Sequence, residues 1–279
     1  MPPIDDDDDD RPRSRGRDEA DDDEDRPRRR RRDDDDFDSE RRKKKSGGGG
    51  LVIAIVIGGI IAVLGCGGIL LFALLLPAIT KVREAASRAQ EMNNLKQIAL
   101  SMHNHASIKR DLPRADDDLS WRVHILPYIE QESLYRQFDL NQPWNQGRNQ
   151  QLADTFILTY QSKLDEPPTA QTHYRAFVGP GTAFDTTLWK RGPFPSYITD
   201  GTSNTILTID TAETVPWPQP KEIPFQPNGS LPEFGNAKRS QVLVALADGS
   251  VRAFDKKKVD QATIRALATA NGNEAIGDW

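Results

Sequence analysis

Histidine is the side chain in this sequence best suited to catalysis or metal binding, and its spacing favours neither. His103 and His105 form the pair HNH, but positions two apart on a helix point in different directions, so we expect both at the surface of a helix end. His124 and His173 belong to no recognised motif, and the sequence holds no CxxC, HExxH or P-loop pattern. The sequence therefore predicts no cofactor, no metal site and no enzymatic activity.

Two Asp-Gly pairs are the next candidates for chemistry. Asp200-Gly201 opens the stretch DGTSN, and Asp248-Gly249 opens DGS. Their oxygens could bind calcium, but neither stretch carries the spaced acids of a calcium-binding loop. The nearby serines lack the glycine elbow and the matched histidine that a nucleophile would need. We therefore expect both pairs to form turns.

Three tryptophans lie in polar, proline-rich or glycine-rich stretches, namely Trp144, Trp189 and Trp217. The segment VPWPQP at 215–220 is stiff and extended, which makes it hard to bury fully. Exposed rings there could face a ligand, by stacking on an envelope polysaccharide or by binding a proline-rich protein. Alternatively, the rings cap a sheet and anchor long loops. The sequence leaves both interpretations open.

Short strands and helices must position these residues. HYRAFV, TILTID and QVLVALA are apolar or β-branched runs that predict strands. Residues 241–254 predict a hairpin around Asp248-Gly249, and residues 259–270 predict a final helix. Residues 119–138 predict two short helices divided at Pro127. Their predicted core anchors are Trp121, Ile125, Ile129 and Leu134. Strands and helices in separate runs indicate an α+β fold for residues 109–279.

A long amphipathic helix is predicted ahead of this domain, over residues 80–108. Lys81, Arg83, Glu84, Arg88, Glu91 and Lys96 fall outside its apolar stripe. A helix with one such stripe must lay it on another element, which we expect to be the antiparallel sheet. The stripe recurs in steps of three and four at Ile79, Val82, Ala86, Ala89, Met92, Leu95, Ile98, Ala99, Met102 and Ala106.

Residues 51–79 form a run of 29 residues without a charge, longer than the ~20 that a helix needs to cross a bilayer. The run predicts one transmembrane helix that continues into the amphipathic helix, with Pro77 able to kink it. The stretch RRKKK at 41–45 precedes the run, so the positive-inside rule places the N-terminus in the cytoplasm and the C-terminal domain in the periplasm. A cleavable signal or a lipoprotein acylated at Cys66 fits less well.

Four small residues on the predicted membrane helix are each four positions apart: Ala54, Gly58, Ala62 and Cys66. They share one face, where a second backbone could approach closely and form a homo-oligomer. Alternatively, they reflect only the high glycine and alanine content of membrane helices. The single cysteine excludes an intrachain disulfide.

Residues 1–50 form a tail of alternating charge blocks. The first 46 residues hold 19 acidic and 15 basic side chains and almost nothing that could form a core, so we expect disorder. Only RPRRRRR at 26–32 could attract nucleic acid, and its flanking aspartates make nucleic acid an unlikely partner.

The segment LLLPAITKVREAASRAQEMNNLKQIALSMHNH at 74–105 resembles the spine helix of the planctomycete family named domain of unknown function 1559. The resemblance continues in the same order through SWRVHILPYIEQESLYRQFDLNQPW, YRAFVGPGT, SYITDGTSNTILTID, VPWPQPKEIPF and VALADGSVRAF. It implies a type IV pilin-like architecture, with a long helix packed on an antiparallel sheet, and export across the inner membrane. It implies no established reaction.

Two departures from that family bear on function. Family members carry a leader followed by FTLIE, whose fifth-position glutamate serves filament assembly, whereas Ile55 occupies that position here. Lys238 stands where the family has a histidine, ten residues before Asp248. We therefore expect a permanently anchored envelope protein with a structural or binding role. The alternatives are a pseudopilin-type subunit that loses residues 1–50, and a protein that binds or acts on envelope polysaccharide.

Overall fold

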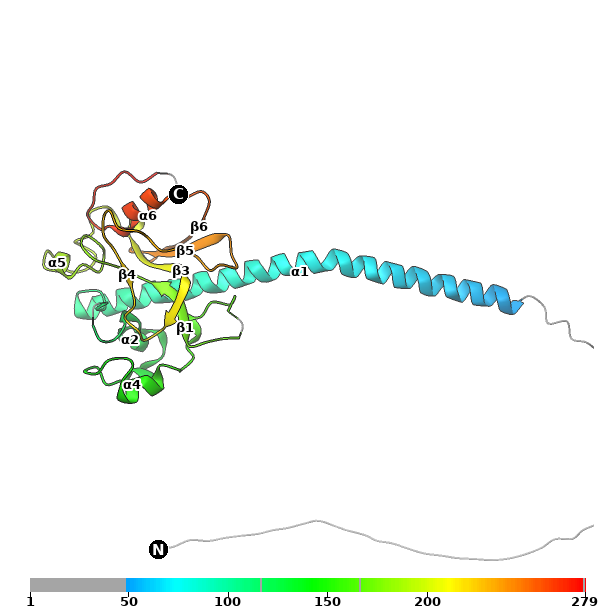
Figure 1. The fold of residues 1–279 in the computed structure, drawn as a ribbon, viewed down its shortest axis with the longest axis horizontal. Helices are drawn as coiled ribbons and strands as arrows, with labels where there is room; N and C mark the ends of the chain where they lie inside the picture. Colours follow the sequence, from blue (N-terminus) through cyan, green and yellow to red (C-terminus); the bar gives the residue numbers. More distant parts are fainter. Residues whose placement is uncertain (1–48, 116, 166, 278) are drawn as a thin grey trace, which may run out of the picture. The chain divides into compact units, whose positions relative to one another are not determined.

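A computed structural model describes residues 49–115, 117–165, 167–277 and 279 (Figure 1). Apart from Gly49 and Gly50, the predicted disordered tail lies outside the described residues. Its disorder and its charge-mediated contacts therefore stay predictions.

The first element is the helix α1, Gly49–Lys109, which runs through Pro77 without interruption. A proline removes a single backbone donor, so the neighbouring turns can keep the helix continuous. Within α1, Gly49–Ile69 is the one stretch among the described residues that is long and apolar enough to cross a membrane, and none of its most apolar window is buried. By its internal contacts the chain divides into two units, Met1–Ile61 and Ala62–Trp279.

The second unit contains a four-stranded antiparallel sheet with the order β1-β3-β5-β6. A separate parallel pair joins β2, Phe177–Val178, to β4, Ile223–Pro224. Together with the helices, the sheet confirms the predicted α+β fold. The four strands are β1, Gln171–Arg175; β3, Ile206–Pro216; β5, Gln241–Leu246; and β6, Val251–Asp255.

The predicted hairpin is present. β5 and β6 pair in register from Gln241 opposite Asp255 to Ala245 opposite Val251. Gly249 closes the turn between them with a φ of 78°, a conformation that glycine adopts without strain.

Short helices connect and cover the strands. The segment predicted as two helices at 119–138 contains three, and all four of its predicted core anchors are buried. Ser120 caps the first of them and Asp260 caps the last helix of the chain, each by accepting a backbone N–H. These helices are α2, Trp121–His124; η1, Leu126–Ile129; α3, Glu132–Tyr135; α4, Gly147–Leu152; η2, Leu158–Tyr160; α5, Thr186–Trp189; η3, Thr202–Asn204; and α6, Gln261–Ala268.

The sheet lies between α1 and α6 (Figure 1). Leu243 and Ala245 of β5 join the core cluster that contains the α1 stripe, whereas Val242 and Val244 join the cluster that contains Ile264 of α6. Alternate residues of one strand point to opposite faces, so burial on both faces explains why residues 242–246, VLVAL, are all apolar.

The amphipathic stripe of α1 is only partly covered. Residues from Leu95 to Ala106 are buried as predicted, and burying each large side chain contributes roughly 1.5–3 kcal/mol. Ile79 and Val82 are exposed, so the prediction that the whole stripe packs on the sheet is wrong for its first part. Glu91, which we placed outside the stripe, is buried, because it lies one helical turn before Leu95 on the covered face.

Candidate functional site

A buried cluster of three charged side chains joins α1 to the sheet. Glu91 of α1, Asp210 of β3 and Arg239 of the loop before β5 are exposed by only 1%, 1% and 5%. The Arg239 guanidinium forms an ion pair with each carboxylate. Glu91 also accepts hydrogen bonds from the Ser162 hydroxyl at 2.7 Å and from the Lys163 backbone N–H at 3.1 Å. Three segments distant in sequence therefore meet at one arginine.

Burial and ion pairing act in opposite directions on the pKa values of Asp210 and Arg239. Burial raises the pKa of Asp210 to about 6, although Arg239 and the backbone N–H of Leu243, 2.6 Å away, both favour the carboxylate. Burial alone would lower the pKa of Arg239, but Asp210 and Glu91 outweigh it, so that pKa is raised. Neutral pH lies above this pKa of Asp210, and Arg239 pairs with both buried acids.

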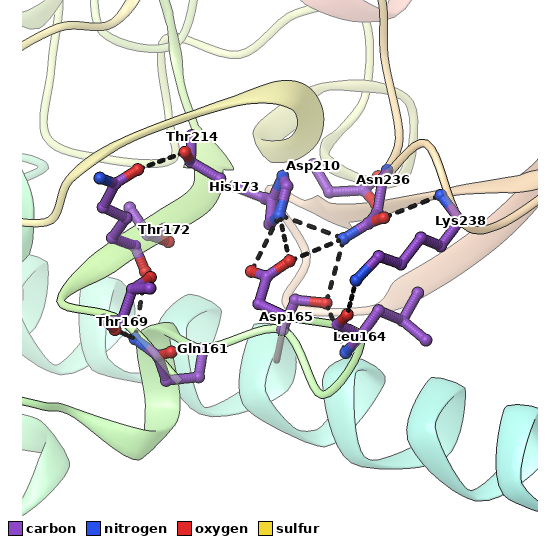
Figure 2. Close-up of polar contacts among 12 residues, drawn as sticks. Gln161, Leu164, Asp165, Thr169, Thr172, His173, Asp210, Thr214, Asn236 and Lys238 are labelled. Atoms are coloured by element: carbon purple, nitrogen blue, oxygen red, sulfur yellow. Dashed lines mark hydrogen bonds and ion pairs between the residues drawn. The ribbon is translucent and has the colours of Figure 1, made fainter. Parts of the chain in front are cut away.

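A second polar cluster surrounds His173 on β1 (Figure 2). Its Nδ1 lies 2.7 Å from the Thr211 carbonyl oxygen, and its Nε2 lies 3.0 Å from Asp165 Oδ2. The Asn236 amide nitrogen donates to Asp165 Oδ1 at 3.3 Å, and its oxygen accepts the Lys238 backbone N–H at 2.9 Å. The cluster thus ties β1, β3 and two loops together.

The charge of His173 follows from these neighbours. Burial alone would lower the pKa of His173, but the hydrogen bonds and charge of Asp165 outweigh burial, so the pKa is raised. Burial likewise opposes the carboxylate of Asp165, but the hydrogen bond and charge of His173, together with Asn236 and Lys238, outweigh burial, so the pKa of Asp165 is lowered. Nδ1 faces the Thr211 carbonyl oxygen, whereas Nε2 faces the Asp165 carboxylate and also lies 3.1 Å from the Asn236 amide nitrogen. While these contacts hold, neither nitrogen has a free lone pair to act as a base.

Lys238, which replaces the histidine of the family pattern, takes part in the same cluster. Its ammonium donates to the Leu164 carbonyl oxygen at 2.5 Å (Figure 2). The side chain therefore bridges the loop at 162–165 to the loop before β5.

The Asp248-Gly249 pair lies against α1. The Asp248 carboxylate accepts the Ser250 backbone N–H at 2.7 Å, and the Lys96 ammonium donates to the Gly249 carbonyl oxygen at 2.6 Å. A Cβ at Gly249 would lie 3.7 Å from Nε2 of His103. The pair forms a turn, and Lys96 fastens that turn to the helix.

The Asp200-Gly201 pair fixes the C-terminal segment. The Asp200 carboxylate accepts the backbone N–H groups of Gly272 at 2.6 Å and Asn273 at 3.0 Å. Gly201 follows with a φ of 97°. Within the described ranges, no three His, Cys, Asp or Glu side chains gather closely enough to hold a metal ion.

Trp217 is fully buried, so of the two interpretations of its ring the ligand-facing one is wrong and the packing one holds. The ring stacks on Tyr160 with centroids 5.8 Å apart, and its Nε1 donates to the Thr155 carbonyl oxygen at 2.9 Å. The prediction of an extended segment is wrong after Pro216, where β3 ends: residues 217–219 turn, and the Gln219 backbone N–H donates to the Pro216 carbonyl oxygen at 3.0 Å. Trp144 and Trp189 are half-buried and pack against the same core.

The small residues Ala54, Gly58, Ala62 and Cys66 are all exposed. No heavy atom lies within 4 Å of a Cβ built on Gly58. A single chain contains no partner helix, so association through these residues stays a prediction.

The largest pocket described lies between α6 and the C-terminal segment and has a volume of about 770 Å³. Arg265 stands at its wall, where its guanidinium donates to the carbonyl oxygens of Gln226 and Pro227. None of the residues singled out from the sequence lines this pocket.

The residues that join the fold together were largely missed from the sequence. Glu91 carried a signal, because an acid four positions before a buried leucine lies on the buried face. Asp210 ends the apolar run TILTID, where a charge on a central strand calls for a buried partner. Arg239 carried no local signal, since its partners lie 148 and 29 residues away.

Comparison with protein families finds one match, to the family described as protein of unknown function (DUF1559), over residues 80–229. The match begins directly after the apolar run and includes Glu91, His173 and Asp210. No curated protein and no solved structure matches the chain. The matched region covers more than half of the 279 residues, and the chain therefore belongs to the family of proteins of unknown function designated DUF1559.

Proposed function

We propose that this protein is a membrane-anchored envelope protein whose pilin-like exported domain has a structural or binding role. One observation carries the proposal. The same helix α1 that contains the exposed apolar stretch Gly49–Ile69 also supplies Leu95, Ile98 and Met102 to the core of the folded domain. The helix that carries the proposed anchor is therefore also part of the core of the domain.

The proposed topology is a single pass through the inner membrane. The five cations of RRKKK at 41–45 precede the apolar run directly, whereas Lys81, Arg83 and Arg88 are more widely spaced after it. The positive-inside bias supports a cytoplasmic N-terminus and a periplasmic C-terminal domain.

The proposed role is contact rather than catalysis. Its support is the way in which the polar side chains are used: Glu91, Asp210 and His173 each bond to other parts of the same chain. An envelope polysaccharide or protein remains the proposed ligand class. Of the three tryptophans singled out from the sequence, Trp144 and Trp189 keep exposed area that could contact such a ligand, whereas Trp217 is in the core.

A processed pseudopilin-type subunit is the alternative. Removal of residues 1–50 would leave a new N-terminus near the start of the apolar run, as in pilin-like proteins. Ile55 supports the anchor instead, because it replaces the glutamate that filament assembly uses in related sequences.

The experiment that decides between these proposals is the intact mass of the mature protein extracted from native membranes. The mass of all 279 residues supports a permanent anchor. Loss of about the first 50 residues would refute the anchor and support the pseudopilin alternative. Cleavage before Cys66 with added lipid would show a lipoprotein and overturn the proposed topology.

A further inference from the structure

The end of the folded domain nearest the apolar part of α1 is rich in exposed cations. On α1 these are Lys81, Arg83 and Arg88. Lys163 and Lys238 follow on two loops, and Lys257 and Lys258 on the turn after β6. We call this set of seven residues the basic end.

Specific contacts hold these segments at one place. Arg88 Nη1 donates to Gln241 Oε1 at 2.8 Å, and Gln241 pairs with Asp255, just before the turn that carries the two adjacent lysines.

The loops are fixed to the same region. The Lys163 backbone N–H donates to Glu91, and the Lys238 ammonium donates to the carbonyl oxygen of Leu164. Cations from four separate segments therefore share one end of the domain.

The positive charge of the basic end is not explained by the charge of the domain as a whole. Residues 80–279 carry 22 basic and 23 acidic side chains, so a uniform distribution would leave every end close to neutral. Among the described residues, the exposed or half-exposed acids within three positions of these cations in the chain are Glu84, Asp165, Asp255 and Asp260. Asp165 faces His173, Asp255 accepts the Lys257 backbone N–H, and Asp260 accepts the Thr263 backbone N–H at the start of α6. The excess positive charge at this end is therefore local.

The basic end also begins at the height of the lipid headgroups. Lys81 follows the last residue of the apolar run, Ile79, by two positions, and Arg88 lies about 14 Å beyond Ile79 along a helix. The headgroup layer extends roughly 5–7 Å beyond the hydrocarbon on each side. A 29-residue run is about 13 Å longer than the hydrocarbon is thick, and tilting absorbs such a surplus. Tilting lowers one side of the domain towards the membrane.

We propose that the basic end binds the anionic phospholipid headgroups of the leaflet from which α1 emerges, and so sets the orientation of the domain on the membrane. This inference rests on the proposed membrane anchor. The observation that supports this proposal is that seven exposed cations lie together beside the start of the folded domain. Long lysine and arginine side chains can reach headgroups while their stems pack on the protein. The seven cations are exposed and distributed over four segments, which suits an extended surface of lipid headgroups better than one small anion.

The test uses the full chain with one reporter. Cys66, the only cysteine, is replaced by serine, and Ser240→Cys, at an exposed position within the basic end, receives a nitroxide. The protein is reconstituted in nanodiscs of neutral phosphatidylcholine, or of phosphatidylcholine with about one-third phosphatidylglycerol. A trace of lipid with a Ni²⁺-chelating headgroup reports contact between the nitroxide and the headgroup layer.

We expect strong headgroup contact in the anionic discs, weak contact in the neutral discs, and loss of the difference at high salt. Each cation near an anionic surface shifts binding about fivefold, so Lys257→Glu with Lys258→Glu should lower the ratio of bound to unbound domain by about 25-fold or more. The matched control is Lys190→Glu with Arg191→Glu, an exposed adjacent pair beside the C-terminal end of α1, which should change little.

The outcomes separate the two proposals. A chain that does not enter the discs overturns the membrane anchor and this inference together. A chain that enters the discs but gives the same contact in neutral and anionic lipid overturns this inference alone. Equal losses in the two double variants would assign the effect to net charge rather than to the basic end, and would also overturn it.

Discussion

Replacing Arg239 with methionine removes the cation between Glu91 and Asp210 while keeping a side chain of similar length. Both carboxylates are exposed by only 1%, so the variant leaves two buried acids without their ion-pair partner. Breaking a buried ion pair in this way costs about 3–5 kcal/mol. For a domain of this size, each kcal/mol lowers the melting temperature by about 2–4 °C, so we expect a decrease of about 6–20 °C.

The assay is thermal unfolding of the full chain in detergent micelles, followed by tryptophan fluorescence. Trp121 and Trp217 are fully buried and report loss of the core. The matched control is Arg136→Met, which breaks the exposed ion pair with Glu132 and should cost less than about 1 kcal/mol.

A rescue variant tests the cause. Combining Arg239→Met with Glu91→Gln and Asp210→Asn removes all three charges, so most of the lost stability should return. The reasoning is refuted if Arg239→Met costs no more than Arg136→Met. It is also refuted if the triple variant is no more stable than Arg239→Met, because the loss would then not come from unpaired carboxylates.

Three further predictions concern other contacts. Because the pKa of His173 is raised, its contribution to stability is complete below the ordinary value of 6.5 and is lost as pH rises through the raised value. His173→Gln should therefore reduce the decrease in melting temperature between about pH 6 and pH 9. The control is His124→Gln, because burial lowers the pKa of His124. This variant should instead reduce the decrease in melting temperature that occurs below about pH 6.5. Gly249→Ala should destabilise by about 1–2 kcal/mol in urea unfolding because of its positive φ, and Gly277→Ala, with no positive φ, should change stability far less. Trp217→Ala should cost about 3–5 kcal/mol in the same assay, and a near-normal midpoint would contradict its place in the core.

The elements that depend on local pattern could be predicted from the sequence. The α1 stripe, the hairpin around Gly249 and the helix at Gln261–Ala268 each follow from spacing within a few residues. The burial of Trp217 could not be decided from the sequence, because its flanking prolines describe the backbone and not the depth at which the ring packs.

The contacts that join these elements could not be predicted. The pairing of Arg239 with Glu91 spans 148 residues, and that of Lys96 with Gly249 spans 153. No periodicity links such positions, since their proximity is a result of the complete fold. The prediction that the whole stripe is covered failed for the same reason, because the sheet reaches α1 only from about Glu91 onward.

The separation of α1 from its partners also bears on biosynthesis. The helix is among the first segments translated, whereas the arginine and the hairpin turn that fasten it are made about 150 residues later. At about 5–20 residues per second, the ribosome needs roughly 7–30 s to supply them. During that time the stripe from Leu95 to Ala106 has no sheet to cover it. An uncovered apolar stripe is prone to aggregate, so this interval before the last strands emerge is the stage of synthesis at which the chain is most vulnerable.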